Sequence, residues 1–171
     1  MNKNSKNNLE IERKYVIEMP DFDLISSQPE YTSSEILQIY LASSDGETRR
    51  IRRRSYKDRV EHTETTKIRI DKISSRELER EISAEEFDLL SKEIREGSTP
   101  LNKTRYTFLY LENTMEIDVY PGWKRTAIME TEMDGYDKEV ALPPFIKIVK
   151  EVTGDKAYSN SSMATKFPNE L

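Results

Sequence analysis

The chain of 171 residues contains no cysteine. Disulfide frameworks and thiolate metal sites are therefore excluded, and the composition fits a reducing compartment. Long apolar runs are missing too: residues 1–8, MNKNSKNN, are polar, and nothing behind them is long enough for a signal peptide or a membrane span. We expect a cytoplasmic protein with no membrane partner, whose residues 1–8 are flexible.

A surplus of charge of one sign is also absent. Charged residues make up 35% of the chain, with 32 acids against 27 bases and a net charge of -5. Because proteins that bind nucleic acids usually show a net basic balance, we expect no nucleic-acid partner. The only histidine, His62, begins a predicted strand among charged neighbours and is interpreted as a surface residue. The length predicts one domain over 1–171, and its C-terminal segment 155–171 has no clear periodicity and an expected frayed end.

Strand patterns dominate what is present. Alternating apolar and polar residues predict eight strands at about 9–17, 34–42, 47–55, 62–71, 75–83, 102–111, 114–120 and 126–134. The separators SSDGE at 43–47 and PGWKR at 121–125 have the composition of turns. Such short gaps favour hairpins, so we expect one large antiparallel sheet.

A few helices are expected beside this sheet. The capping box that begins at Ser83 predicts a helix over 83–97. Apolar residues at helical spacing behind two prolines predict another over 143–154. A short helical turn is expected around 21–27.

Charges of one sign repeat on one face of several predicted strands. The bases with this spacing are Arg50, Arg52, Lys67, Arg69, Lys103 and Arg105, and the acids are Glu10, Glu12, Glu77, Glu79, Glu130 and Glu132. The choice of these arginines within RRIRRR, over Arg49 and Arg53, depends on a one-residue register. A single polar face could be explained by solvent. Like charges side by side are destabilising, however, so their repetition on several strands indicates a ligand site.

The two kinds of charge suit two kinds of ligand. Carboxylates on rigid strands are ligands for Mg²⁺ or Mn²⁺, and clustered Arg and Lys side chains bind phosphate oxygens. Closing the sheet would place this face inside an eight-stranded barrel. The expected fold class is therefore α+β and mainly antiparallel β: a closed tunnel barrel with a charged interior and a few helices outside.

The motif Glu10-x-Glu12-x-Lys14 resembles the N-terminal signature of the CYTH domain, or triphosphate tunnel metalloenzyme, family. Further blocks that resemble the family in order and spacing are QIYL at 38–41, RIRRR at 50–54, TKIRI at 66–70, RELEREI at 76–82, LNKTRY at 101–106, MEIDVYPG at 115–122, METEM at 129–133 and EVTGDKAYSN at 151–160. The resemblance covers nearly the whole chain. It implies an eight-stranded tunnel with a metal-dependent activity on triphosphate compounds.

The resemblance also implies roles for single residues. The metal, Mg²⁺ or Mn²⁺, would be held by Glu10, Glu12, Asp118, Glu130 and Glu132. The substrate-binding set would be Lys14, Arg50, Arg52, Lys67, Arg69, Glu77, Glu79, Lys103 and Arg105. For Glu77 and Glu79, a second metal site and orientation of the bases both remain open. Lys14 and Lys67 are the candidate catalytic bases, since a lysine surrounded by cations can have a lowered pKa.

Three functions fit these features. The first is hydrolysis of inorganic triphosphate to pyrophosphate and phosphate, which is favoured because the recognisable residues all suit phosphate and metal. No adenine pocket can be recognised, and Tyr120 and Trp123 are interpreted as packing residues. The second is the activity of other family members, namely adenylate cyclases of the CyaB type or thiamine triphosphatases. The third is a polyphosphate-binding module without turnover, against which the many carboxylates argue. The partner is thus a small-molecule triphosphate, and the resemblance makes a homodimer a candidate assembly.

Overall fold

The computed structural model describes residues 9–171, so the flexibility expected for residues 1–8 lies outside the described residues. The described chain forms one sheet of nine strands. The strands are β1 (Leu9–Glu18), β2 (Thr32–Leu41), β3 (Glu47–Ser55), β4 (Val60–Arg69), β5 (Ser74–Glu81), β6 (Leu101–Tyr110), β7 (Asn113–Val119), β8 (Thr126–Glu132) and β9 (Ile148–Glu151). The first eight match the predicted strands to within a few residues.

The helices are short. They are α1 (Phe22–Ser26), α2 (Ala84–Leu90) and α3 (Asn160–Met163), with 3-10 turns η1 (Ser91–Glu93) and η2 (Lys156–Tyr158). The side chain of Ser83 accepts a bond from the backbone N–H of Glu86 at 3.0 Å, as the capping box predicted. The α-helix stops at Leu90, before the predicted end. No helix in residues 9–171 is long and apolar enough to cross a membrane.

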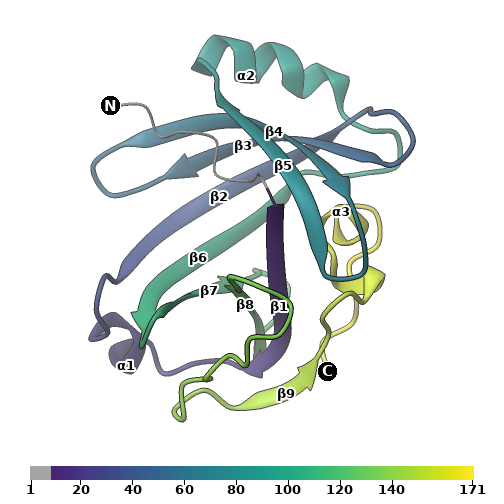
Figure 1. Ribbon diagram of the computed structural model, residues 1–171. Helices are drawn as coiled ribbons and strands as arrows, with labels where there is room; N and C mark the ends of the chain where they lie inside the picture. Colours follow the sequence, from purple (N-terminus) through teal and green to yellow (C-terminus); the bar gives the residue numbers. More distant parts are fainter. Residues whose placement is uncertain (1–8) are drawn as a thin grey trace, which may run out of the picture.

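The sheet closes on itself. Its strands follow the order β5-β4-β3-β2-β6-β7-β8-β1-β9, and β1 also pairs with β5 through Leu9 opposite Arg76. This pairing converts the first eight strands into a barrel, with β9 added along β1 (Figure 1). The predicted fold class, a closed eight-stranded antiparallel barrel with a few helices outside, is confirmed.

The helix predicted over 143–154 is wrong. Residues 148–151 form β9, which pairs antiparallel with Tyr15, Val16 and Ile17 of β1. Beyond Ile11, β5 no longer covers this edge of β1, and the unpaired backbone groups there need partners. Pairing with β9 satisfies them, and Arg13 adds an ion pair to Glu151 at 2.7 Å. The edge of the neighbouring strand therefore outweighs the local helical spacing.

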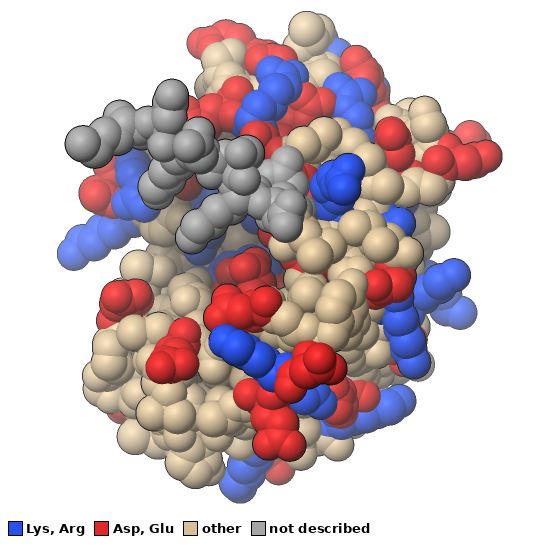
Figure 2. Space-filling view, viewed as in Figure 1, with Lys and Arg blue, Asp and Glu red and all other residues tan. Residues whose placement is uncertain are grey.

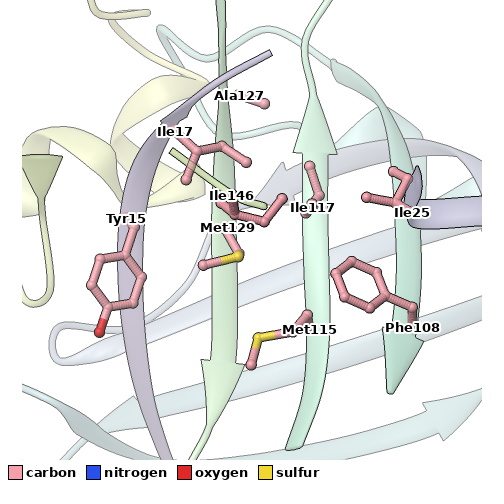
Figure 3. Close-up of a cluster of buried hydrophobic side chains, with 9 residues drawn as sticks. All are labelled: Tyr15, Ile17, Ile25, Phe108, Met115, Ile117, Ala127, Met129 and Ile146. Carbon is pink, nitrogen blue, oxygen red and sulfur yellow. The ribbon is translucent and has the colours of Figure 1, made fainter. Parts of the chain in front are cut away.

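The main hydrophobic core lies on the outer side of the barrel. Tyr15 and Ile17 of β1 pack there with residues of β6, β7 and β8, and Ile25 of α1 and Ile146 cover them (Figure 3). A second outer cluster places Phe87 and Leu90 of α2 over β2 and β3. Because the side chains of a strand alternate, apolar packing outside directs the charged side chains inward.

The C-terminal segment packs against the barrel, so the expected frayed end is wrong. The rings of Phe167 and Trp123 lie 5.4 Å apart, and Nε1 of Trp123 donates to the carbonyl oxygen of Pro168 at 3.2 Å. The carboxylate of Glu170 accepts hydrogen bonds from the backbone N–H groups of Lys124, Arg125 and Thr126. The bond from Thr126 is 2.6 Å long. The PGWKR turn thus provides partners that local periodicity does not reveal.

Candidate active site

A cavity of about 730 Å³ lies in the interior of the barrel. The predicted site residues that line it are Glu10, Glu12, Lys14, Arg50, Arg52, Lys67, Arg69, Glu77, Glu79, Arg105, Glu130 and Glu132. Figure 2 shows basic side chains deep in a hollow of one face, with acidic side chains below them. The one-residue register within RRIRRR is as predicted, because Arg49 instead pairs with Glu64 at 2.6 Å outside the cavity lining.

One end of the interior is filled by apolar side chains. Val16 and Ile128 continue the inward faces of Lys14 and Glu130 and pack against Val152, Tyr158 and Met163. Gly154 has a positive φ of +71°, and a Cβ there would lie 2.6 Å from Cγ of Lys72. The C-terminal segment is thereby held close to the turn between β4 and β5, across this end of the barrel.

Two predicted site residues, Lys103 and Asp118, are on the inward faces of β6 and β7 but lie deeper in the barrel, toward its filled end. They do not line the cavity, and their side chains are 0% and 1% exposed. Asp118 accepts bonds from Nζ of Lys103 at 2.7 Å and from Nε of Arg105 at 2.7 Å. Burial alone would raise the pKa of Asp118, but Arg105 and Lys103 hold it well below its usual range. Both oxygens of Asp118 are thus occupied by the two bases, which is the arrangement of a partner that orients Arg105.

Arg105 lines the cavity and is surrounded by acidic side chains. Besides its bidentate bond to Asp118, it contacts Glu116 and lies 3.7 Å from Glu130. Glu130 in turn pairs with Lys14 at 2.9 Å. Burial opposes the charge of Glu130, but Lys14 and Arg105 lower its pKa to about 2. These ion pairs fix the bases of β1 and β6 in place.

Arg50 and Arg52 have fewer acidic partners. Among residues 9–171, Arg50 has one salt-bridge partner, Glu77 at 3.8 Å, and Arg52 has none. Burial, together with Arg50 and Arg105, lowers the pKa of Arg52 to about 9. Nε of Arg50 is buried and has no hydrogen-bond partner in the described chain. A buried polar group without a partner is costly, so this wall of the cavity is suited to an anion.

Carboxylates gather on the opposite part of the wall. Glu12 and Glu132 are directly opposed on β1 and β8, with Glu10 further along β1. Burial and Glu77 raise the pKa of Glu10 to about 8, and burial, Glu116 and Glu12 raise that of Glu132. Such shifts mean that the acids have too few cations around them.

The donor chemistry of these acids fits a hard divalent cation. No three acid or histidine side chains within residues 9–171 converge tightly enough to form a ready-made cation site. Mg²⁺ does not need one, because it keeps several waters and is often bound by one or two carboxylates together with a phosphate ligand. Glu10, Glu12 and Glu132 could hold a cation in this way beside the anion-binding wall.

The expected lowering of the lysine pKa values is wrong for Lys14 and Lys67. Burial disfavours the charge of both, but Glu130 and Glu12 raise the pKa of Lys14. Glu12 and Glu77 likewise raise the pKa of Lys67. The lysine with a lowered pKa is Lys103, where burial, Arg105 and Arg52 bring it to about 7. The sequence shows the neighbouring cations of these lysines but not the acids that the barrel brings close from other strands.

Glu77 and Glu79 lie among the bases and polar groups of β3 and β4. Glu77 pairs with Lys67 at 3.0 Å, and Glu79 accepts a bond from the hydroxyl of Thr65 at 2.9 Å. Of the two roles left open by the sequence, these contacts favour orientation of the bases.

Three residues of the site were not assigned from the sequence. Glu116 lines the cavity, as does Tyr40, and the buried Gln38 bonds Arg52. Glu116 could have been found, because it alternates with Asp118 on one face of MEIDVY. Gln38 gives no such signal, since a lone amide in a strand is not part of a charge pattern.

Solved structures with a similar fold include two of the protein NE1496. One, described as the inorganic triphosphatase NE1496, is 27% identical with a TM-score of 0.59, and the match covers 94% of this chain and 97% of that one. The other is 28% identical with a TM-score of 0.59, over 93% and 99% of the two chains. The protein PH1819 from Pyrococcus horikoshii shares the fold at 23% identity, with a TM-score of 0.56 over 75% of this chain and 80% of that one. No protein-family model and no curated protein matches the sequence.

Proposed function

We propose that this closed barrel is a CYTH-type tunnel enzyme, a divalent-metal-dependent triphosphatase that hydrolyses inorganic triphosphate to pyrophosphate and phosphate. The similarity to a protein described as an inorganic triphosphatase, which extends over nearly the full length of both chains, supports the proposal. The cavity supports it independently, through the residues of its wall.

The observation that carries the proposal is the imbalance of partners inside the barrel. Arg50 and Arg52 converge on the cavity with little neutralisation, and Nε of Arg50 lacks a partner among residues 9–171. The charges of a triphosphate chain would satisfy these groups, and guanidinium forks match its oxygens. Lys14, Lys67, Arg69 and Arg105 would hold the remaining phosphates from neighbouring strands.

The acids of β1 and β8 would hold Mg²⁺ or Mn²⁺. Glu10, Glu12 and Glu132 are its proposed ligands, with Glu130 and Glu116 beside them. The bound cation would neutralise charge on the phosphate oxygens and on the leaving group. Asp118 is proposed as a positioning residue instead, because both of its oxygens are occupied by Lys103 and Arg105.

Hydrolysis breaks one phosphoric anhydride bond. A water oxygen adds to a terminal phosphorus as the bridging oxygen leaves with pyrophosphate, and the water proton is released. The bases of β3, β4 and β6 would keep the chain in line with the water, so positioning and electrostatics provide most of the rate enhancement. Lys14 and Lys67 are proposed as phosphate ligands, since their raised pKa values do not suit a base.

The wall of the cavity favours an inorganic substrate over a nucleotide. Tyr120 and Trp123, the aromatic residues expected near the barrel, are 1% and 3% exposed beneath the C-terminal segment. Tyr40 is the one aromatic residue lining the described cavity, and it is only 2% exposed, with its hydroxyl bonded to Gln38. A nucleobase would therefore find no free ring beside the triphosphate on which to stack.

A comparison of substrates tests this choice. Purified protein would be incubated with inorganic triphosphate, ATP or thiamine triphosphate, each with Mg²⁺ or Mn²⁺, and kcat/KM would be measured for each. We expect the highest value for inorganic triphosphate. A higher value for either organic substrate, or formation of cyclic AMP from ATP, would contradict the proposal.

A further inference from the structure

Gln38 is a fully buried amide on β2, directly opposite Arg52 on β3. Its Oε1 accepts bonds from Nε and Nη2 of Arg52 at 3.2 and 3.1 Å. Its Nε2 donates to the hydroxyl of Tyr40 at 2.6 Å. Rotation of this amide would break bonds at both ends, at a cost that burial increases. Gln38 therefore fixes the direction in which the guanidinium of Arg52 points.

The partner of Arg52 is neutral, as are those of Arg54 and Arg69, whereas three other bases of the wall have acidic partners. Arg105 bonds Asp118, Lys14 pairs with Glu130, and Lys67 pairs with Glu77. Within residues 9–171, the side-chain bonds of Arg52 go to the oxygen of Gln38 alone. The positive charge of Arg52 is thus fixed in place without being neutralised.

A carboxylate at position 38 would be the better partner for Arg52 alone. Glutamate has nearly the shape of glutamine, could accept the same two bonds, and would strengthen them through its charge. It would also relieve the repulsion of Arg52 by Arg50 and Arg105, which the neutral amide leaves in place. The neutral amide therefore leaves the charge of Arg52 available for an anion.

Resting on the function proposed above, we propose that Gln38 is a positioning residue that sets the affinity of the tunnel for the triphosphate. Its neutral amide aims Arg52 at the phosphate oxygens and leaves the full charge of the guanidinium for them. The same position occupied by an acid would give an equally ordered but weakly binding site.

The test measures binding of inorganic triphosphate by calorimetry, with EDTA present so that no turnover occurs. The wild type is compared with Gln38→Glu, with Gln38→Met, and with Gln28→Glu as a matched control. Gln28 bonds the carbonyl oxygen of Leu24 at 3.1 Å near the surface and is not part of the cavity lining. The control thus makes the same charge change away from the site.

We expect Gln38→Glu to weaken binding at least about tenfold, the size of effect that a close opposite charge has on a neighbouring equilibrium. Its melting temperature should equal or exceed that of the wild type, and Gln28→Glu should bind as the wild type does. Gln38→Met preserves the charge of Arg52 but removes the bonds that fix the orientation of its guanidinium. We therefore expect a smaller loss of affinity for triphosphate, about threefold.

Undiminished binding by Gln38→Glu would overturn the role of the neutral charge. Should that variant fail to fold, Gln38→Met decides, because wild-type affinity there would overturn the aiming role. The proposed function has a separate readout: a wild type that binds triphosphate in EDTA but releases no phosphate with Mg²⁺ would contradict the hydrolase assignment and leave the effect of Gln38 on binding intact.

Discussion

At the level of single residues, carboxylates with the same alternating pattern in the sequence have different roles in the barrel. Glu10, Glu12 and Glu132 lie in the cavity, whereas Asp118 is buried in a cluster with Lys103 and Arg105. Two substitutions separate the task of holding a cation from the task of holding bases in place.

Glu12→Gln removes one cavity carboxylate. We expect kcat with Mg²⁺ to fall roughly 100-fold, because charge stabilisation at the phosphate chain is lost. Binding of triphosphate in EDTA should persist, since the bases are untouched. Steady-state kinetics and calorimetry check both statements, and Glu18→Gln is the control on the same strand, with Glu18 exposed and 3.3 Å from Lys147. Full turnover in Glu12→Gln would remove Glu12 from the cation site.

Asp118→Asn tests the buried cluster. It leaves Lys103 and Arg105 without their shared charge partner, and breaking a buried pair of this kind costs about 3–5 kcal/mol of unfolding free energy. Urea unfolding measures the change, with the surface substitution Asp45→Asn as its control. A loss of activity with unchanged stability would show instead that Asp118 acts as a metal ligand.

The residue scale also shows what alternation in a sequence reveals. Like charges at a spacing of two correctly indicated that Arg50, Arg52, Glu10 and Glu12 share one face. Alternation gives the side of the sheet and not how far the cavity extends along the barrel, so the buried Lys103 could not be distinguished from Arg105, which lines the cavity. The acids that raise the lysine pKa values come from distant strands, which no local pattern reveals.

At the scale of elements, the strands were predicted well because their alternation agrees with the final packing. The failure at 143–154 shows the limit of local patterns. Ile148 and Val149 fit a helical stripe, but the free edge of β1 offered backbone partners that a helix would have left unused. The C-terminal segment likewise takes its conformation from the turn before β8.

The contact between the C-terminal segment and this turn should depend on pH. Burial opposes the charge of Glu170, but the backbone N–H groups of residues 124–126 together outweigh it and lower its pKa to about 2. In the unfolded chain, the pKa of a glutamate side chain is about 4.3. The stabilisation by Glu170 is therefore complete above that pH and is lost as the pH falls toward 2.

Glu170→Gln should accordingly lower the melting temperature at pH 7, and the difference from the wild type should shrink as the pH falls from about 5 toward 2. Thermal unfolding followed by circular dichroism measures it, with Glu139→Gln as an exposed control. A difference that stays constant over this range would show that the carboxylate charge of Glu170 does not contribute.

At the scale of the whole molecule, the barrel encloses more charge than it neutralises, and a ligand should complete it. Inorganic triphosphate at 100 times its dissociation constant should raise the unfolding free energy by about 2.7 kcal/mol. For a chain of this size the melting temperature should rise by roughly 5–10 °C. The rise should occur in EDTA and shrink at high salt, because the bases of the wall carry it. An unchanged melting temperature would contradict an anion-binding tunnel.

The activity proposed for the tunnel is hydrolysis of inorganic triphosphate. Phosphorus NMR of the protein with inorganic triphosphate and Mg²⁺ tests it most directly, because it identifies and counts the products. We predict that pyrophosphate and phosphate form in equal amounts, and that formation stops when EDTA removes the metal. Triphosphate that remains intact in the presence of Mg²⁺ and Mn²⁺ would contradict the account.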